Sequence, residues 1–344
     1  MASDLPRLSA IVVAHRRPRP TALCIESLLA QTERELEVIV VLNDPTPLVE
    51  AVVHDRTGSD PRVRIICTKT SASEARNHAV AIAKAPILYF VDDDVSVPER
   101  TVETLLAVFQ SAPEFSAVGG PNLTPPDDPE FAQITGEVLA SPWGTGVASP
   151  RYARRAPRRA SERHLILCNL AVHRRVFEQG IRFPLHFGGE ENVILGRASQ
   201  RGFALWYSPD VWVYHRRRYS LRAYAVQLVR YGRGRALALR AAPGTFHVAY
   251  FVPVAFGLYL AALPIFGFWG FWAYTPLLAY FGGTLLSSLL IAVRRRRAQW
   301  VLLLPGLFVL THLAYAYGLV TGLIRTPRGH AAAPDPPSAT SPLS

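Results

Sequence analysis

The chain has 344 residues, three cysteines, a formal net charge of +11 and a sequence pI of about 9.9. This length allows one substantial domain with further segments, and the basic excess fits nucleic acid, anionic lipid or a phosphorylated substrate as partner. Cys24, Cys67 and Cys168 lack Cys-x-x-Cys spacing, which argues against a disulfide framework and a zinc site and favours a reducing compartment. We expect no signal peptide, because no apolar segment precedes Leu8.

The first part of the chain alternates between strand and helix patterns. Apolar runs at 8–14, 36–42, 63–67 and 87–91 predict buried strands, while 21–32 and 73–84 predict helices, the second opened by Ser73. This alternation predicts an α/β domain with a mostly parallel sheet. Ligands bind such sheets at the carboxyl ends of the strands, where His15, Asp44 and Asp92 fall, so we expect these residues to converge.

The next part is less regular. A strand-and-loop region begins at 119–122, and further strands are predicted at 165–172, 203–207 and 211–215. A helix is predicted from the segment 187–192 to about Gln200. The segment Arg151 to Arg163 contains six arginines and is either a solvated loop or a lid over a bound substrate.

The acidic run Asp92-Asp93-Asp94 at the end of the fourth strand is the strongest chemical signal. Carboxylates are hard oxygen ligands, and three neighbouring ones repel one another unless a cation lies between them. Mg²⁺ or Mn²⁺ held in this way also takes oxygens from a substrate phosphate. A solvated acidic turn is the alternative, but the surrounding motifs favour a metal–nucleotide site.

The C-terminal part predicts a membrane region. No Asp, Glu, Lys or Arg occurs from Val248 to Val293, which fits two spans joined by a turn near Pro264-Ile265-Phe266-Gly267. The four arginines 294–297 end this run, and a third apolar run follows. The expected spans are about 248–266, 271–293 and 299–324. Pro305, Gly306, Gly318 and Gly322 leave open whether the third run spans or forms a re-entrant or interfacial helix.

Charge placement predicts the orientation. Arginines cluster at 216–240 and 294–297, on both sides of the first two spans. The positive-inside rule then places both clusters and the first domain in the cytoplasm. We therefore divide the chain into a catalytic domain (1–215), basic interfacial helices (216–247), a membrane region (248–324) and a disordered tail (325–344). The tail lies outside if the third run crosses.

Five motifs in this order resemble the family 2 inverting glycosyltransferases of the GT-A fold, over roughly Leu8 to Arg240. They are the turn 13–18, Asn43-Asp44, Ser73-Glu74-Ala75-Arg76-Asn77, the Asp92–Asp94 run as a DxD motif, and 187–192, which is similar to a Gly-Gly-Glu-Asp motif. Tyr214-His215 resembles a late metal-binding histidine of some members. The resemblance implies a bacterial enzyme of cell-envelope or exopolysaccharide synthesis, and a UDP-sugar as the favoured donor. The donor-binding residues that it implies are Ala14, His15, Arg17, Asn43, Asp44, Arg76, Asn77, Asp92 and Asp93.

Sugar transfer from a nucleotide sugar requires neutralisation of the leaving diphosphate, which a divalent cation supplies as a Lewis acid. Asp94 is the expected direct ligand of Mn²⁺ or Mg²⁺. Asp92 contacts the metal, the ribose or both, and Asp93, which points the opposite way on an extended segment, is structural or donor-binding. His215 is a further metal ligand or a packed histidine.

An inverting transfer also needs a general base on the acceptor hydroxyl. Glu190 and Glu191 stand at a helix start, where the helix dipole favours ionised carboxylates. Glu191 occupies the position where the family usually has Asp and is our first choice, with Glu190 second. Simple N-terminal helix charge is the alternative.

A basic segment before the first span predicts the acceptor. Arg230, Arg233 and Arg235 resemble the arginine-rich interfacial helix of membrane-bound family members and would face the diphosphate of a polyprenyl-linked acceptor. Part of this charge also serves topology and anionic membrane lipid.

Two other functions compete with a membrane-bound transferase. A processive polysaccharide synthase fits less well, because three short spans are few for a channel and no clear Gln-x-x-Arg-Trp motif occurs. A non-catalytic nucleotide-binding scaffold has no need for Asp92, Asp94 and Glu191 together. A nucleic-acid binder would gather its basic residues on the soluble domain rather than beside spans.

Overall fold

The computed structural model describes residues 5–58, 60–185, 188–266, 268 and 270–324. Its centre is an eight-stranded sheet with the order β3-β2-β1-β4-β9-β6-β10-β8. These strands are β1 (Leu8–Ala14), β2 (Leu36–Asn43), β3 (Val63–Thr68), β4 (Ile87–Asp92), β6 (Phe115–Gly119), β8 (Arg158–Arg159), β9 (Leu170–His173) and β10 (Ala204–Tyr207). Every residue of β2 is buried, as the continuous apolar run predicted.

The sheet is mixed rather than wholly parallel. Strands β3, β2, β1 and β4 are parallel, but β9 is antiparallel to both β4 and β6, and β8 is antiparallel to β10. The strand expected at 165–172 is therefore shorter, because Leu167–Asn169 forms a 3₁₀ turn before β9 begins.

Helices cover both faces of the sheet, because successive strand residues point to opposite sides. Val38 and Val40 pack on the face covered by α1 (Pro18–Leu29), α2 (Pro47–Thr57) and α4 (Thr101–Ser111). Ile39 and Val41 pack on the other face, against α3 (Ala72–Ile82), α7 (Arg174–Glu178) and α8 (Glu190–Gln200). Neither α2 nor α4 was expected from the sequence.

The start of α3 differs from the expectation. Ser73 lies inside the helix, and Ser71 is the N-cap, with its side chain accepting a hydrogen bond from the backbone N–H of Glu74. Glu74 in turn accepts from the backbone N–H of Ser71, which completes a capping box. This cap fixes the first turn of α3, on which Arg76 lies.

A second sheet of three short strands lies beside the end of β4. Its order is β5 (Val95–Ser96), β11 (Val213–His215) and β7 (Asn122–Leu123). In the antiparallel pairing of β11 with β5, His215 lies opposite Val95. Residues far apart in sequence, His215 and the acidic run, are thereby brought together.

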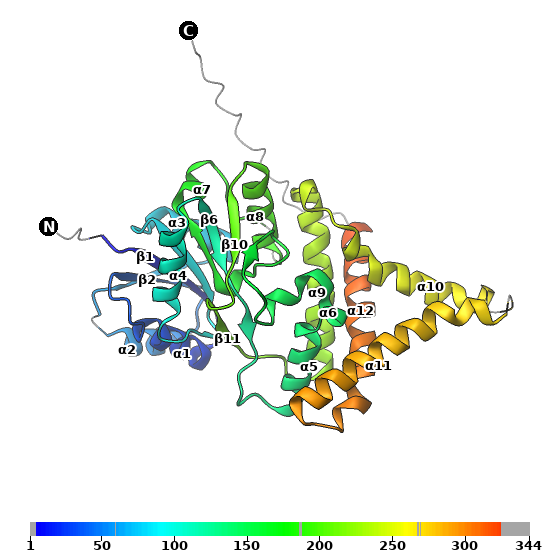
Figure 1. Cartoon of the computed structure of the whole chain (residues 1–344). Coiled ribbons are helices and arrows are strands. Elements are labelled where there is room, and N and C mark those ends of the chain that lie inside the picture. The colour runs from blue at the N-terminus through cyan, green and yellow to red at the C-terminus, as the bar shows by residue number, and fades with distance from the viewer. Residues whose placement is uncertain (1–4, 59, 186–187, 267, 269, 325–344) are drawn as a thin grey trace, which may run out of the picture.

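The remaining helices form the other side of the molecule (Figure 1). They are α5 (Glu130–Ala140), α6 (Pro142–Thr145), α9 (Leu221–Ala241), α10 (Val252–Phe266), α11 (Thr275–Arg295) and α12 (Trp300–Ile324). In Figure 1, α9 and α12 stand side by side next to the sheet domain, and α10 and α11 form a hairpin that projects away from it.

Three segments of the described chain are long and apolar enough to cross a membrane: Val248–Phe266, Phe271–Arg295 and Trp300–Ile324. They match the three predicted apolar runs. The hairpin connection comes later than expected, because Pro264 lies inside α10 and a 3₁₀ turn at Phe271–Tyr274 precedes α11. Gly267 of the predicted turn, Phe187 of the predicted motif and the predicted disordered tail lie outside the described residues.

Candidate active site

One cavity of about 1630 Å³ connects the carboxyl ends of the central strands with the apolar helices. At one end it is lined by Asp92, Asp93 and Asp94, and at the other by Phe256 of α10 and Tyr280 of α11. Of the three residues expected to converge at the strand ends, His15 and Asp92 line this cavity, whereas Asp44 does not.

The three aspartates have different neighbours. Arg17 forms ion pairs with both Asp93 and Asp94. Asp93 is 2% exposed and also accepts from Thr21 Oγ1 at 3.4 Å. Asp92 Oδ1 lies 3.4 Å from Arg76 Nη2, and Asp94 Oδ1 lies 3.2 Å from His215 Nε2.

These neighbours separate the acidities of the three groups. Burial raises the pKa of Asp93 to about 6, although Arg17 opposes the shift, and burial likewise raises the pKa of Asp92 against Arg76. Burial acts in the same direction on Asp94, but His215 and Arg17 outweigh it and hold the pKa of Asp94 well below its usual range. Asp94 is thus the most acidic member of the run.

His215 is the positive partner of Asp94. Burial disfavours its protonated form, but the adjacent Asp94 carboxylate outweighs burial and raises the pKa of His215 to about 10. Arg17 and His215 together place positive charge against Asp94, on the side where a divalent cation is expected.

The described residues contain no group of three or more His, Cys, Asp or Glu side chains arranged to hold a metal ion. The donor set nevertheless fits a cation that takes part of its coordination from a substrate diphosphate, since Asp92, Asp94 and His215 all line the cavity at one end.

Glu190 lies close to the donor end of the cavity. Its Oε1 is 3.6 Å from Arg76 Nη1 and 3.4 Å from Ser73 Oγ. Burial raises the pKa of Glu190, while Arg76 opposes the shift. Arg76 therefore lies between two carboxylates, Asp92 and Glu190.

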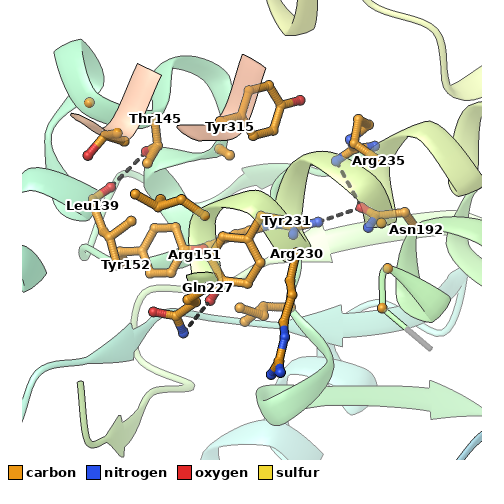
Figure 2. Close-up of a pocket in the computed structure, with 18 of the residues that line it drawn as sticks. Leu139, Thr145, Arg151, Tyr152, Asn192, Gln227, Arg230, Tyr231, Arg235 and Tyr315 are labelled. Atoms are coloured by element: carbon orange, nitrogen blue, oxygen red, sulfur yellow. Dashed lines mark hydrogen bonds between the residues drawn. The ribbon is translucent and has the colours of Figure 1, made fainter. Parts of the chain in front are cut away.

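Glu191 is held by a different set of groups. Arg151 Nη1 lies 3.2 Å from Glu191 Oε1, and Asn192 Nδ2 donates to the same oxygen at 3.0 Å. Arg151 also donates to Asn192 Oδ1 at 2.7 Å (Figure 2). Arg151 is 7% exposed, so the first residue of the predicted basic loop is buried and positions a carboxylate.

Two glycines set the position of these glutamates. Gly189, the N-cap of α8, has φ +77°, and Gly188 has φ +97°, a region that favours glycine. A Cβ on Gly234 of α9 would lie 3.0 Å from the carbonyl group of Gly188. The glycine turn before Glu190 therefore packs directly on α9.

The expected donor residues divide into two groups. His15, Arg17, Asn43 and Arg76 line the cavity together with the aspartates. Ala14, Asp44 and Asn77 do not. Asp44, at φ +50°, pairs with Arg16 at 2.6 Å, and Asn77 exchanges two hydrogen bonds with the backbone of Phe183.

The three arginines predicted to bind the acceptor also differ. Arg230 lines the cavity, and Figure 2 shows its side chain pointing away from Arg235. Arg235 is buried, donates to Asn192 Oδ1 at 3.0 Å and stacks over Tyr250. Arg233 does not line the cavity and donates to Thr321 Oγ1 of α12 at 3.4 Å. Arg230 and Arg235 therefore both line the cavity and Arg233 does not, and a role of the first two in acceptor binding stays a prediction.

Part of the cavity wall consists of residues that were not expected from the sequence. Gln227 and Tyr231 line it on either side of Arg230, and Gln227 Nε2 donates to the Tyr231 hydroxyl at 3.0 Å (Figure 2). Their Gln-x-x-Arg-Tyr spacing differs from the motif that was sought only in its last residue. Tyr315 of α12 and Tyr152 complete this wall, and no local sequence signal identified them.

Comparison with known proteins was made for sequence and structure. The family model described as Glycosyl transferase family 2 matches residues 9–181. The chain is 29% identical over 100 residues to the glycosyltransferase GlyG of Streptococcus pneumoniae, a match that covers 28% of this chain and 33% of GlyG. It is 31% identical over 119 residues to the O-antigen biosynthesis glycosyltransferase WbnJ of Escherichia coli, covering 33% of this chain and 46% of WbnJ. The matched stretch thus spans less than half the length of these relatives.

Among solved structures, the chain is similar to mannosyltransferase PcManGT from Pyrobaculum calidifontis in complex with GDP-Man and Mn²⁺. The TM-score is 0.66 at 17% sequence identity, and the match covers 93% of this chain and 88% of the other. At this identity the likeness shows a shared fold.

Proposed function

The chain belongs to glycosyl transferase family 2, an inverting and metal-dependent family, and we propose that it transfers a sugar from a nucleotide-sugar donor to a lipid-linked or growing glycan acceptor. The family and the GT-A fold that the motifs predicted are both confirmed. The donor, the acceptor and the residues that perform the reaction are proposals.

The observation that carries this function is the single cavity. It joins an acidic run at the strand ends, two glutamates at a helix start and the wall of apolar helices. A donor diphosphate at the acidic end and an acceptor entering from the helices would meet beside Glu190 and Glu191.

At the donor end, Asp94, Asp92 and His215 would hold the cation, which would replace the proton that the Asp94 carboxylate keeps on His215. A divalent cation bound there supplies Lewis acidity that offsets the charge developing on the leaving diphosphate. Arg76 lies next to Asp92 and can donate to the same diphosphate, while His15 and Asn43 line the region where the nucleoside would lie.

At the acceptor end, Glu191 would accept the proton of the attacking hydroxyl. The hydroxyl oxygen then forms the new bond at the anomeric carbon while the bond to the diphosphate oxygen breaks, which inverts the configuration. Arg151 and Asn192 fix the orientation of the Glu191 carboxylate, a requirement for a general base. Arg230 lies in the wall where an acceptor phosphate would pass.

We place the reaction at the cytoplasmic face of a bacterial inner membrane, in polysaccharide synthesis. Support comes from the three apolar helices and from the similarity to WbnJ, an O-antigen biosynthesis glycosyltransferase. The division into 1–215, 216–247 and 248–324 belongs to this proposal. A processive synthase is the second candidate, because Gln227, Arg230 and Tyr231 in the cavity wall have a spacing close to the Gln-x-x-Arg-Trp motif.

The experiment that tests the proposal measures donor binding and hydrolysis on detergent-purified protein. The donors are UDP-, GDP- and dTDP-sugars, with GDP-mannose included because the solved neighbour is in complex with it. Each is assayed with Mn²⁺ or Mg²⁺, for the natural chain and for Asp94→Ala. Metal-dependent binding or turnover of one donor, lost in the variant, is the expected result. Absence of metal-dependent binding for every donor would favour the non-catalytic scaffold.

A further inference from the structure

The second half of helix α12 is packed along α9, from Thr311 to Leu323. Tyr224 OH lies 2.8 Å from Thr311 Oγ1 near one end, and Arg240 of α9 donates to the carbonyl of Leu323 at the other. Contacts advance together along both helices, so α9 and α12 run parallel. Figure 1 shows the two helices standing side by side.

Glycines bring the two helices close together. A Cβ on Gly318 would lie 2.2 Å from the carbonyl oxygen of Val229, and one on Gly232 would lie 2.2 Å from that of Tyr315. Small residues at these positions allow the backbones to touch. No lipid chain or water layer separates α12 from α9 at these contacts.

Helix α9 is itself packed on the catalytic domain. Arg235 reaches Asn192 at 3.0 Å, and Gly234 packs on the glycine turn before Glu190. A helix fixed to α9 lies at the same membrane depth as α9, and α9 carries Arg222, Arg230, Arg233, Arg235 and Arg240. If α12 crossed the bilayer, these arginines and the catalytic turn would be drawn into hydrocarbon, where charged side chains are costly.

Both ends of α12 also lie against helices that pack on the catalytic domain, α5 at its start and α9 at its end. At its start, Trp300 Nε1 donates to Glu130 of α5 at 2.9 Å, and Arg294 and Arg295 pair with Glu137. At its end lies Arg240. Arginines at both ends do not fit a crossing helix, since the positive-inside rule would place only one end on the basic side.

The outer face of α12 remains apolar and exposed. Leu302 is 84% exposed, Tyr317 57% and Ile324 75%, while Leu304, Phe308 and Leu319 on the opposite face are buried against the protein. An exposed apolar face backed by a basic helix is the pattern of a helix lying in the membrane interface.

We infer that α12 lies in the plane of the membrane interface, between the bilayer and the catalytic domain, and does not cross. The lipid surface is the partner of its exposed face, and the chain after Ile324 stays on the side of the catalytic domain. The inference rests on the membrane association proposed above, and it selects the interfacial alternative for the third apolar run.

The test uses the natural Cys67, which is exposed on the catalytic domain, while Cys24 and Cys168 are buried. An impermeant maleimide is applied to spheroplasts and to inverted vesicles from expressing bacteria. The variants are Cys67→Ser, expected to be silent, and Cys67→Ser with Ser344→Cys. We expect the cysteine at position 344 to be labelled in the same preparation as Cys67.

Labelling of position 344 in the opposite preparation would overturn the inference, and labelling only after detergent would also overturn it. An alkaline wash of the same membranes separates the two proposals. Protein released by the wash contradicts the membrane association itself, whereas retained protein with opposite labelling contradicts only the placement of α12.

A second measurement does not depend on the tail. Spin labels at Leu302, Tyr317 and Ile324 should report equal, shallow depths in vesicles if α12 lies in the interface. A crossing helix would place position 317 about 10 Å deeper than 324, because seven residues rise 1.5 Å each.

Discussion

Asp93 and Asp94 are adjacent in sequence but have different roles in the site. Asp93 is almost fully buried against Arg17 and Thr21, whereas Asp94 lies between Arg17 and His215 at the cavity. We expect Asp94→Asn to weaken metal-dependent donor turnover by about 10²-fold or more, because a charged group of the diphosphate site is lost. Asp93→Asn should instead lower the thermal unfolding temperature and leave the metal concentration for half-maximal turnover nearly unchanged.

Metal titrations of donor turnover together with thermal unfolding scans distinguish these two variants. Asp55→Asn, on the exposed surface of α2, is the matched control for removal of one carboxylate. Equal shifts in metal requirement for Asp93→Asn and Asp94→Asn would contradict the separation of roles.

The two glutamates at the start of α8 can be separated in the same way. Glu191→Gln should lower kcat by about 10² to 10⁴-fold with donor binding intact, because the variant cannot accept a proton. Glu190→Gln should have the smaller effect on kcat, since Glu190 pairs with Arg76 at the donor end. Single-turnover rates with a saturating donor provide the measurement, and a larger loss for Glu190→Gln would transfer the base role to that residue.

Glu37 predicts a pH dependence of stability. Burial raises the pKa of Glu37, but hydrogen bonds from Ser9, Lys84 N–H and Arg64 outweigh it and lower the pKa in the folded protein. A lowered folded pKa stabilises the protein above the unfolded pKa, about 4.3, and this contribution is lost as the pH falls through the folded value. Glu37→Gln should lower the apparent Tm by roughly 5 °C near neutral pH, and the difference should shrink below about pH 4.

Thermal scans of the natural chain and the variant across this pH range test the prediction. Glu35→Gln, whose side chain is half exposed, should show no such change. A difference between Glu37→Gln and the natural chain that grows on acidification would have the wrong sign and reject the assignment.

Sequence motifs identified the charged residues of the site, but they did not identify the buried residues that hold these side chains in place. The aspartates, Arg76 and Glu191 stand in recognisable motifs, and all line the cavity. The burial of Arg151 against Glu191 joins residues 40 positions apart and depends on the tertiary fold, so the run of arginines suggested a solvated loop or a lid instead. The same limit applies to Arg235, whose partner Asn192 could not be known from spacing.

At the scale of elements, the strands were predictable because buried parallel strands are continuously apolar. Strand β2 begins at the expected residue and ends one residue later than predicted. The helix α2 was missed because its apolar residues form no clear stripe: Val49 and Val53 are buried, but Leu48 is exposed. Strand β9 was predicted to begin too early because the 3₁₀ turn Leu167–Asn169 follows an apolar stretch that resembles a strand. Neither strand direction nor sheet order is contained in the local pattern, so the antiparallel β9 was not predictable.

The close contact between α9 and α12 predicts that adding one methyl group at Gly318 lowers the stability of the protein, whereas the same change at an open position does not. Gly318→Ala places a Cβ against the carbonyl oxygen of Val229, so the helices must separate or shift. Overpacking of this kind costs about 1–3 kcal/mol, which corresponds to a fall of roughly 2–10 °C in the apparent Tm. Gly306→Ala on the same helix is the matched control, because a Cβ there meets nothing within 4 Å.

Fluorescence-monitored unfolding in detergent compares the two variants. Equal Tm values for Gly318→Ala and Gly306→Ala would show that α12 does not rest on α9. Activity of Gly318→Ala should also fall, since Tyr315 and His312 of α12 line the cavity.

For the whole molecule, the catalytic domain and the C-terminal helices share a core. Trp300, Leu304 and Phe308 of α12 pack with Ile134 and Val138 of α5. A chain ending after residue 247 loses this packing, so we expect it to aggregate or to unfold well below the natural chain. A chain ending after Ile324 keeps every cavity residue and should retain donor binding.

Size-exclusion chromatography and donor-binding isotherms of the two truncated chains provide the measurement. A monomeric 1–247 fragment with the Tm and the metal-dependent donor affinity of the full chain would contradict a shared core. The lengths of the apolar runs predicted three candidate spans. They could not reveal this shared core, because a helix packed on protein and a helix in lipid can have the same composition.

Helix α9 meets backbone on two sides, with Gly232 against α12 and Gly234 against the turn before Glu190. Since glycine alone lacks a Cβ, every missense mutation at these codons adds an atom where another main chain already lies. Gly282 and Gly306 face open space, so a side chain there would meet no other atoms. Selection therefore constrains these two positions through backbone packing, and a substitution found there in a sequenced strain would indicate a loss of function although glycine supplies no functional group.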